Sequence, residues 1–107
     1  MKILYVAVDG HQFAKKEDCL DHEWYLSHKD KLRYIHFWDI RGNKLYNILD
    51  ESTYLKVHTI FLQSSEDIET LQELAHYKEF RDYYHINKPG MWVWNDRQDA
   101  FVFVDTD

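Results

Sequence analysis

Seven histidines and one cysteine are the side chains of this sequence best suited to binding a metal ion. Cys19 and His22 are three positions apart, so within a helix they would lie on one face. A closed zinc site takes four protein ligands and a catalytic one takes three, so His11 or His28 would have to complete the set. A lone cysteine in a helix also serves as a small buried side chain. We therefore predict no metal and no cofactor, and we keep a metal-binding protein or metal-dependent enzyme using Cys19 and His22 as an alternative.

The sequence lacks the motifs of common catalytic sites. None of its serines stands in a G-x-S-x-G elbow, and Ser64 and Ser65 fit the start of a helix instead. Its three glycines are isolated from one another, so no glycine-rich phosphate-binding loop can be written. Cys19 and His22 at helical spacing project in parallel rather than toward each other, which disfavours a nucleophile and base pair. The sequence therefore predicts a protein that is not an enzyme.

Acidic residues are concentrated in the second part of the chain. Residues 45–107 carry twelve Asp and Glu against five Lys and Arg, and the formal net charge of the whole chain is -6. Direct binding to nucleic acid is not expected, because contacts to phosphate require cationic side chains. A basic partner is favoured instead, although acidic side chains can also simply keep an aromatic-rich domain in solution.

The acidic residues of the second predicted helix are the best candidate for a partner-binding surface. They are expected on its outward side, and two tryptophans on one side of a later strand could act as aromatic anchors. The residues predicted to bind a partner are Glu66, Asp67, Glu69, Glu73, Trp92 and Trp94. The alternative is that the tryptophans fill the core and that the acids form ordinary solvated faces.

Several features bear on the cellular setting. No run of about 18 or more apolar residues is present, so neither a membrane span nor a membrane partner is expected. The first residues have no basic and apolar pattern of a secretion signal. A single cysteine excludes an intrachain disulfide. These features together predict a cytoplasmic protein, and they leave its oligomeric state undecided.

A small α+β fold must position these residues. Residues 2–8 form a continuous apolar and β-branched run, which is typical of a central strand covered on both faces. Apolar spacing predicts helices over residues 15–31 and from Ser64 onward, where Ser64 and Asp67 have the spacing of a capping box. Alternating apolar and polar residues predict a long strand over residues 54–63.

Further strands are predicted over residues 34–39, 91–94 and 100–104, and the last two are expected to form a hairpin. Residues 44–52 are ambiguous, with helical spacing over barely two turns. The expected order is β-α-β-(α)-β-α-β-β, in a mixed, largely antiparallel sheet with two main helices on one face. Residues 1–107 are expected to form a single compact domain.

Two stretches of the sequence resemble the small early proteins of tailed bacteriophages. The first is Asp9-Gly10-His11-Gln12-Phe13, followed by a helix with Cys19 and Glu23, and the second is Pro89-Gly90-Met91-Trp92-Val93-Trp94. The resemblance extends loosely over most of the chain and lies mostly in structural positions. It implies an accessory protein of the host cytoplasm that binds and blocks a host factor, including host defence systems, and it transfers no catalytic residue.

The hypothesis is therefore a non-enzymatic, phage-encoded accessory protein that inhibits or redirects a host protein through an acidic, aromatic-rich surface. Inhibition of a host enzyme that handles nucleic acid, such as a CRISPR effector, is its sharpest form. A small metal-binding protein remains the first alternative. The second is a self-assembling structural protein held by Trp92, Trp94 and the hairpin edge.

Overall fold

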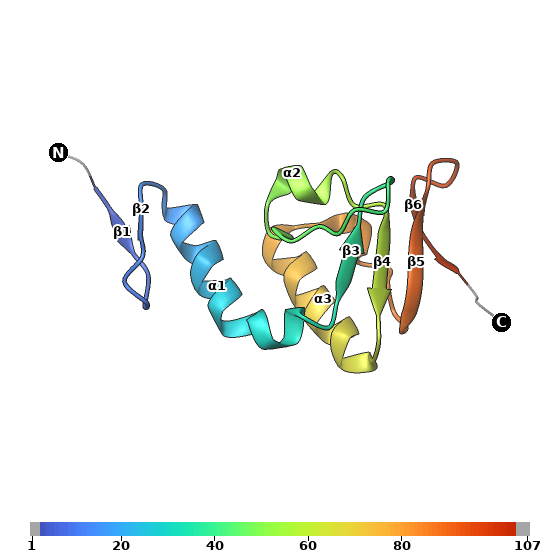
Figure 1. The fold of residues 1–107 in the computed structure, drawn as a ribbon, viewed down its shortest axis with the longest axis horizontal. Coiled ribbons are helices and arrows are strands. Elements are labelled where there is room, and N and C mark those ends of the chain that lie inside the picture. The colour runs from blue at the N-terminus through green and yellow to red at the C-terminus, as the bar shows by residue number, and fades with distance from the viewer. Residues whose placement is uncertain (1–2, 105–107) are drawn as a thin grey trace. The chain divides into compact units, whose positions relative to one another are not determined.

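The chain divides into two compact units, Met1–Asp30 and Lys31–Asp107, and the computed structural model describes residues 3–104. We describe each unit by itself, and the single-domain hypothesis stays a prediction. The α+β class and the approximate order of elements are confirmed (Figure 1). In chain order, the described elements are β1 (Tyr5–Val6), β2 (Gln12–Phe13), α1 (Lys16–Leu32), β3 (His36–Trp38), α2 (Glu51–Tyr54), β4 (Thr59–Leu62), α3 (Ser65–Lys78), the 3-10 helix η1 (Arg81–Tyr83), β5 (Gly90–Asn95) and β6 (Ala100–Val104).

The N-terminal unit begins with a two-stranded hairpin rather than with a central strand. Among the described residues, β1 pairs only with β2, in antiparallel fashion. The chain reverses at Gly10, whose φ of +91° suits a turn, and the Ala7 N–H donates to the His11 carbonyl at 2.8 Å. The predicted central strand over residues 2–8 is therefore wrong, and Lys2 lies outside the described residues. An apolar run favours a strand, but it does not specify how many neighbours that strand has.

Helix α1 confirms the predicted helix over residues 15–31. Glu17 and Asp18 occupy its first turn, where the unpaired N–H groups favour acidic side chains. Cys19 follows them and is buried, as expected for a small apolar side chain. Neither this helix nor any other in the described residues has the length and apolar character needed to cross a membrane.

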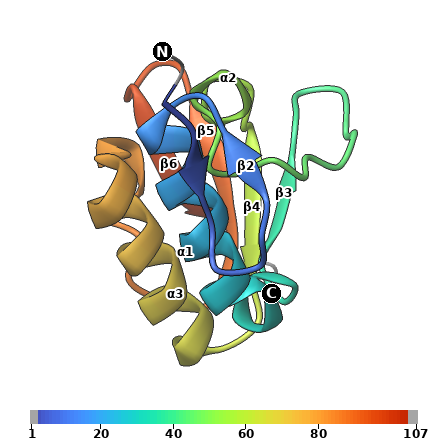
Figure 2. The ribbon, with the colours of Figure 1, turned by 90° about the vertical axis from the view of Figure 1, so that its left-hand side faces the viewer.

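The C-terminal unit is built on a four-stranded sheet in the order β3-β4-β5-β6. Each neighbouring pair is antiparallel, so the sheet is antiparallel rather than mixed, and β5 with β6 forms the predicted hairpin. Helix α3 packs against β4 on one face of the sheet (Figures 1 and 2). The largest fully buried side chains form the core between them, namely Phe37, Ile60, Leu62, Leu71, Leu74, Tyr83 and Ile86.

Strand β4 is shorter than the predicted strand over residues 54–63. The Asp50 side chain accepts a hydrogen bond from the Ser52 N–H at 3.0 Å and caps the short helix α2, whose last residue, Tyr54, is the first residue of that region. The second part follows the predicted alternation, because Ile60 and Leu62 are both buried in β4. The helix that this cap begins ends at Tyr54, and the strand starts only at Thr59.

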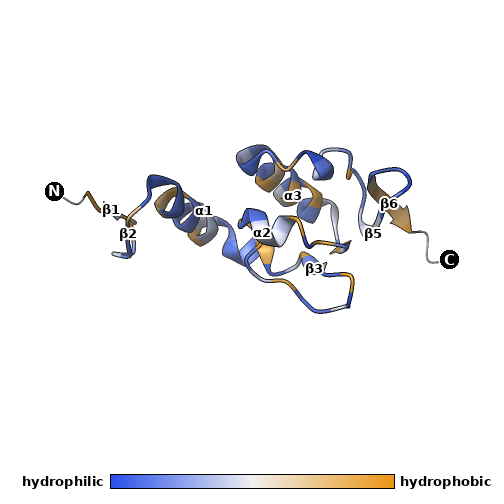
Figure 3. Cartoon of the chain, turned by 90° about the horizontal axis from the view of Figure 1, so that it is seen from above, coloured by the Kyte–Doolittle hydropathy of each residue, from blue (hydrophilic) through white to orange (hydrophobic). Residues whose placement is uncertain are grey.

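Helix α3 confirms the predicted helix from Ser64 and its capping box. The Asp67 carboxylate accepts hydrogen bonds from the N–H groups of Gln63 and Ser64, at 2.8 and 3.1 Å. Leu71 and Leu74 belong to its buried stripe. Figure 3 shows hydrophilic and hydrophobic segments alternating along this helix, as expected when one face packs and the other contacts solvent.

Gly90 begins β5 at a position that excludes a side chain. Its φ is +132°, and an added Cβ would lie 2.5 Å from Cε2 of Phe103 in the neighbouring strand. The Lys88 ammonium lies 3.9 Å from the centroid of the same ring. The Phe103 ring therefore packs tightly against the backbone at the start of the hairpin.

Candidate partner-binding site

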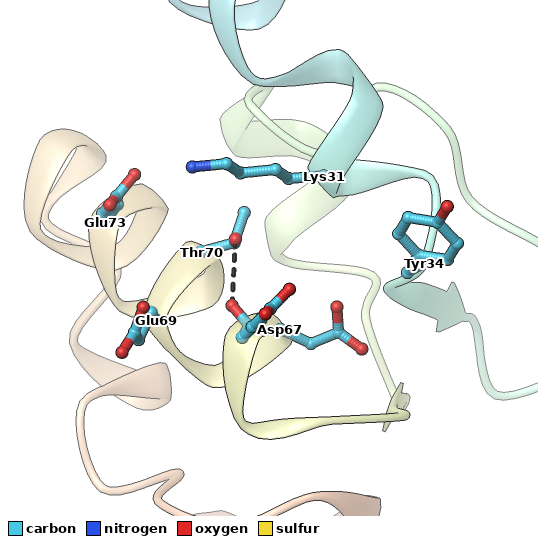
Figure 4. Close-up of a pocket in the computed structure, with 7 residues that line it drawn as sticks. Lys31, Tyr34, Asp67, Glu69, Thr70 and Glu73 are labelled. Atoms are coloured by element: carbon cyan, nitrogen blue, oxygen red, sulfur yellow. Dashed lines mark hydrogen bonds between the residues drawn. The ribbon is translucent and has the colours of Figure 1, made fainter.

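Within the C-terminal unit, a hollow of about 340 Å³ lies between α3 and the residues Lys31 and Tyr34 (Figure 4). All of its lining residues belong to the C-terminal unit. They are Lys31, Tyr34, Glu66, Asp67, Glu69, Thr70 and Glu73. The hollow thus brings together the four acidic residues that the sequence singled out, with one basic residue on the opposite wall.

Three of these acids, Glu66, Glu69 and Glu73, are exposed and come from successive turns of α3. Figure 4 shows Lys31 extended above Thr70, with its ammonium end on the Glu73 side of the hollow. The Thr70 hydroxyl donates to the Glu66 carbonyl at 3.1 Å, so this polar group is satisfied within the helix. Exposed carboxylates outnumber the cation in the hollow, and an incoming cationic group would therefore be attracted to it.

Asp67 differs from the other three acids, because it is only 4% exposed. Its Oδ2 already accepts the two backbone hydrogen bonds of the helix cap. The first turn of a helix leaves N–H groups without partners, and a short acidic side chain at this position satisfies those of the preceding residues. We therefore assign Asp67 to the fold and correct its prediction as a partner-binding residue.

Trp92 is also a core residue, since it is only 6% exposed. Its indole Nε1 donates to the Lys88 carbonyl at 3.1 Å. Its ring makes edge contacts with His85 and Phe103, at centroid distances of 5.7 and 5.5 Å. The sequence left two roles open for this tryptophan, and the structure places it among the residues that fill the core.

Trp94 is half-buried and lies outside the acidic hollow. Its Nε1 donates to Oδ1 of Asp96 at 2.8 Å, and its ring packs edge-on against Phe101. With Tyr54 and Asp82 it contributes to a smaller hollow of about 210 Å³. Of the two predicted aromatic anchors, Trp94 is therefore the one that retains exposed surface. This surface is not part of the hollow that the acids of α3 line.

Cys19 and His22, the ligands of the alternative metal-binding hypothesis, belong to different surroundings, since among the described residues His22 groups with Asp9 and His11. Burial, with smaller contributions from the charges of Glu23 and Asp9, raises the pKa of the Cys19 thiol, which disfavours the thiolate that would bind a metal or attack a substrate. The Nε2 of His22 instead donates to Oδ2 of Asp9 at 2.8 Å, and this bond is the main reason why the pKa of the Asp9 carboxyl is lowered to about 2.

Sequence reasoning missed the wall of the hollow that faces α3. Lys31 and Tyr34 lie more than thirty positions before the acids, and no spacing rule connects the two segments. Thr70 could have been found, because it follows Glu66 by one helical turn and shares its face of α3. Acidic residues at helical spacing predict a negatively charged helix face. A hollow can be predicted only when the residues that pack beside that helix are known.

The comparisons found no family model, no curated protein and no solved structure that matches the chain. The resemblance to early proteins of tailed phages is therefore still a prediction, and the function has to be argued from the residues of the site.

Proposed function

We propose that the chain is a non-enzymatic accessory protein of a tailed bacteriophage that acts in the host cytoplasm by binding a basic surface of a host protein. Glu66, Glu69 and Glu73 form the binding site, and the bound host protein is inhibited or redirected. The phage origin rests on the sequence resemblance alone. A host enzyme that handles nucleic acid, such as a CRISPR effector, is the sharpest candidate, because such enzymes carry basic grooves for phosphate.

The observation that carries this proposal is the acidic hollow itself. A lysine or arginine side chain entering it would lie within reach of carboxylates from three turns of one helix, while its aliphatic part would contact the Tyr34 wall. An arginine side chain is expected to bind there better than a lysine, since its planar guanidinium binds carboxylates through two parallel hydrogen bonds. Lys31 already occupies one side, so the hollow itself takes up one cationic side chain of the basic surface.

Charge also explains why the site would steer a partner before contact. Attraction between an acidic patch and a basic groove accelerates encounter and weakens as salt rises, because ions screen charges separated by more than about 8 to 10 Å. Binding through this hollow should therefore be tight at low salt and lose affinity steadily as salt is added. A partner held through apolar contacts alone would not show this dependence.

The test is affinity capture from host lysate at low and moderate salt, with three versions of the tagged chain. The first is the wild type, and the second reverses the charge of the hollow through Glu66→Lys, Glu69→Lys and Glu73→Lys. The third makes the same change in net charge outside the hollow, at the exposed residues Glu17, Glu51 and Glu79. Circular dichroism establishes that all three are folded.

The expected result is one host protein that the wild type and the control variant retain, that salt releases, and that the hollow variant does not bind. Isothermal titration with that purified protein should then show at least about a tenfold loss of affinity in the hollow variant, as expected for several charge pairs. Equal capture by the hollow variant and the wild type, or no specific capture at either salt, would rule the proposal out.

A further inference from the structure

We propose that Asp9, His11 and His22 of the N-terminal unit bind one divalent transition metal ion of the zinc class. These three residues offer two imidazole nitrogens and a carboxylate oxygen, and their ligand atoms all lie within 4.8 Å of one another. The set excludes Cys19, which the sequence had paired with His22. It is independent of the acidic hollow, which belongs to the other unit.

The hairpin turn presents two of the three ligands. The Gly10 N–H donates to the Ala7 carbonyl at 3.0 Å, and the Ala7 N–H donates to the His11 carbonyl at 2.8 Å, so the reversal is closed on both sides. Oδ1 of Asp9 accepts from the His11 backbone N–H at 3.2 Å, which fixes the carboxylate over the turn. Asp9 and His11 are thus held together by the backbone and not by side-chain contact alone.

Helix α1 supplies the third ligand. Nε2 of His22 and Nδ1 of His11 each lie 2.8 Å from the same carboxylate oxygen, Oδ2 of Asp9. The two imidazole rings are 4.7 Å apart between centroids, and the ring of Phe13 lies 5.2 Å from that of His22. His22 is therefore positioned by an aromatic neighbour on the hairpin, with its ligand atom directed at the other two groups.

The distances suit a metal after only small movements. Neighbouring ligand atoms around a tetrahedral zinc, with bonds of about 2.0 to 2.2 Å, are separated by about 3.3 to 3.6 Å. The two nitrogens now lie 2.8 Å from the Asp9 oxygen because protons hold them there. For a metal ion to bind, each imidazole would carry its proton on the other ring nitrogen, and each ligand nitrogen would move away from the Asp9 oxygen by less than about 1 Å, which side-chain rotation can supply.

The donor set selects the class of metal. Imidazole nitrogen suits zinc, iron, nickel and copper, whereas calcium and magnesium prefer oxygen ligands alone. Side-chain exposures of 66% at His11, 30% at Asp9 and 23% at His22 leave one side of the group open to water. A metal held by three ligands with an open side has the coordination of a catalytic rather than a structural zinc site.

The first measurement is calorimetric titration of ZnCl₂ into the full untagged chain after removal of metals with EDTA. The wild type is expected to bind one zinc ion per chain. Asp9→Asn, His11→Ala and His22→Ala should each weaken binding at least about tenfold, because each removes one of three ligands. His76→Ala serves as the matched control, since His76 is an exposed histidine of α3 outside the group. It should bind zinc as the wild type does.

The second measurement keeps the test valid where a variant folds poorly. Co²⁺ replaces zinc in the wild type, and its visible spectrum should report nitrogen and oxygen ligands without a band from cysteine thiolate. Cys19→Ser should leave the zinc stoichiometry unchanged. No zinc bound by the wild type, an undiminished site in the His11→Ala and His22→Ala double variant, or equal loss in His76→Ala would each show an Asp–His ion pair only, and would overturn the proposal.

Discussion

The hydroxyl of Tyr54 donates a hydrogen bond of 2.7 Å to Oδ2 of Asp82 and so joins the end of α2 to the 3-10 helix η1, across a sequence separation of 28 residues. The backbone N–H of Asp82 lies 3.3 Å from the same hydroxyl. The Tyr54 ring stacks on Phe80 with a centroid distance of 4.0 Å and an interplanar angle of 3°. This contact helps to hold the end of α2 at Tyr54, the first residue of the stretch that the sequence had predicted as a strand.

Removing the Tyr54 hydroxyl should destabilise the protein without disturbing the packing. Phenylalanine keeps the ring stacked on Phe80, so Tyr54→Phe removes only the hydrogen bonds with Asp82. The expected loss in free energy of unfolding is about 1 to 2 kcal/mol, at the lower end for a bond to a charged group, since Asp82 is partly accessible to water. Urea unfolding at neutral pH measures it, and an unchanged midpoint would contradict the assignment.

The same variant should reveal a dependence on alkaline pH. Burial, followed by the hydrogen bond with Asp82, raises the pKa of Tyr54 to about 12, whereas an unfolded tyrosine titrates near about pH 10. The folded state therefore holds this proton more tightly, and its contribution is complete below about pH 10 and is lost as the pH rises through about 12. The difference in stability between wild type and Tyr54→Phe should shrink over that range, and a constant difference would argue against it.

Gly90→Ala should be among the most destabilising substitutions to alanine in the C-terminal unit. A φ of +132° strains any residue with a side chain, and the new methyl group would lie 2.5 Å from the Phe103 ring. The two effects together should cost about 3 kcal/mol. Gly42→Ala is the matched control, because Gly42 has a φ of +85° and a methyl group added there would meet nothing within 4 Å. Its cost should be about 1 kcal/mol, and equal losses in both variants would contradict the close packing against Phe103.

Glu69→Gln should increase stability. Glu69 lies three positions after Glu66 and four before Glu73, and like charges at these helical spacings repel by about 0.2 to 0.5 kcal/mol per pair. The gain should diminish as salt is added, because the residues are exposed. Thermal unfolding at low and high salt provides the measurement. Repulsion between acidic side chains that lowers the stability of the unbound protein is expected where those charges serve binding. A lower melting temperature for Glu69→Gln would contradict this repulsion.

Asp67→Ala should decrease stability, in contrast to changes at the exposed acids. The substitution leaves the N–H groups of Gln63 and Ser64 without their acceptor, at an expected cost of about 1 to 2 kcal/mol. Glu66→Ala is the control, since its exposed side chain makes no cap hydrogen bond and its loss should change stability by about 0.5 kcal/mol or less. Equal losses of stability in Asp67→Ala and Glu66→Ala would contradict the role of Asp67 as a helix cap.

Local signals in the sequence predicted α3 and the C-terminal hairpin correctly. A capping box followed by apolar residues at helical spacing has few other solutions, and a short polar loop between two apolar runs is typical of a hairpin. The run over residues 54–63 was more ambiguous. Its alternation was compatible with a strand throughout, and the cap at Asp50 decided the conformation of its first residues.

The candidate sites were only partly accessible from the sequence. Glu66, Asp67, Glu69 and Glu73 have nearly the same chemistry; the capping-box spacing already suggested a role of Asp67 in the fold, and the hydrogen bonds from Gln63 and Ser64 show that its carboxylate is used there. Asp9 and His22 are 13 positions apart, and their contact depends on how the hairpin turn meets α1. Spacing within one helix suggested Cys19 as the partner of His22, because such rules do not extend across a turn.

The packing of Gly90 against Phe103 also constrains the ancestry of this protein. A larger residue at position 90 keeps full stability only if the side chain at position 103 becomes smaller and the backbone leaves its positive φ. The two positions are therefore expected to change together. Distant relatives that lack the glycine should also lack an aromatic residue at position 103, which gives a two-position signature for finding them where overall sequence similarity has faded.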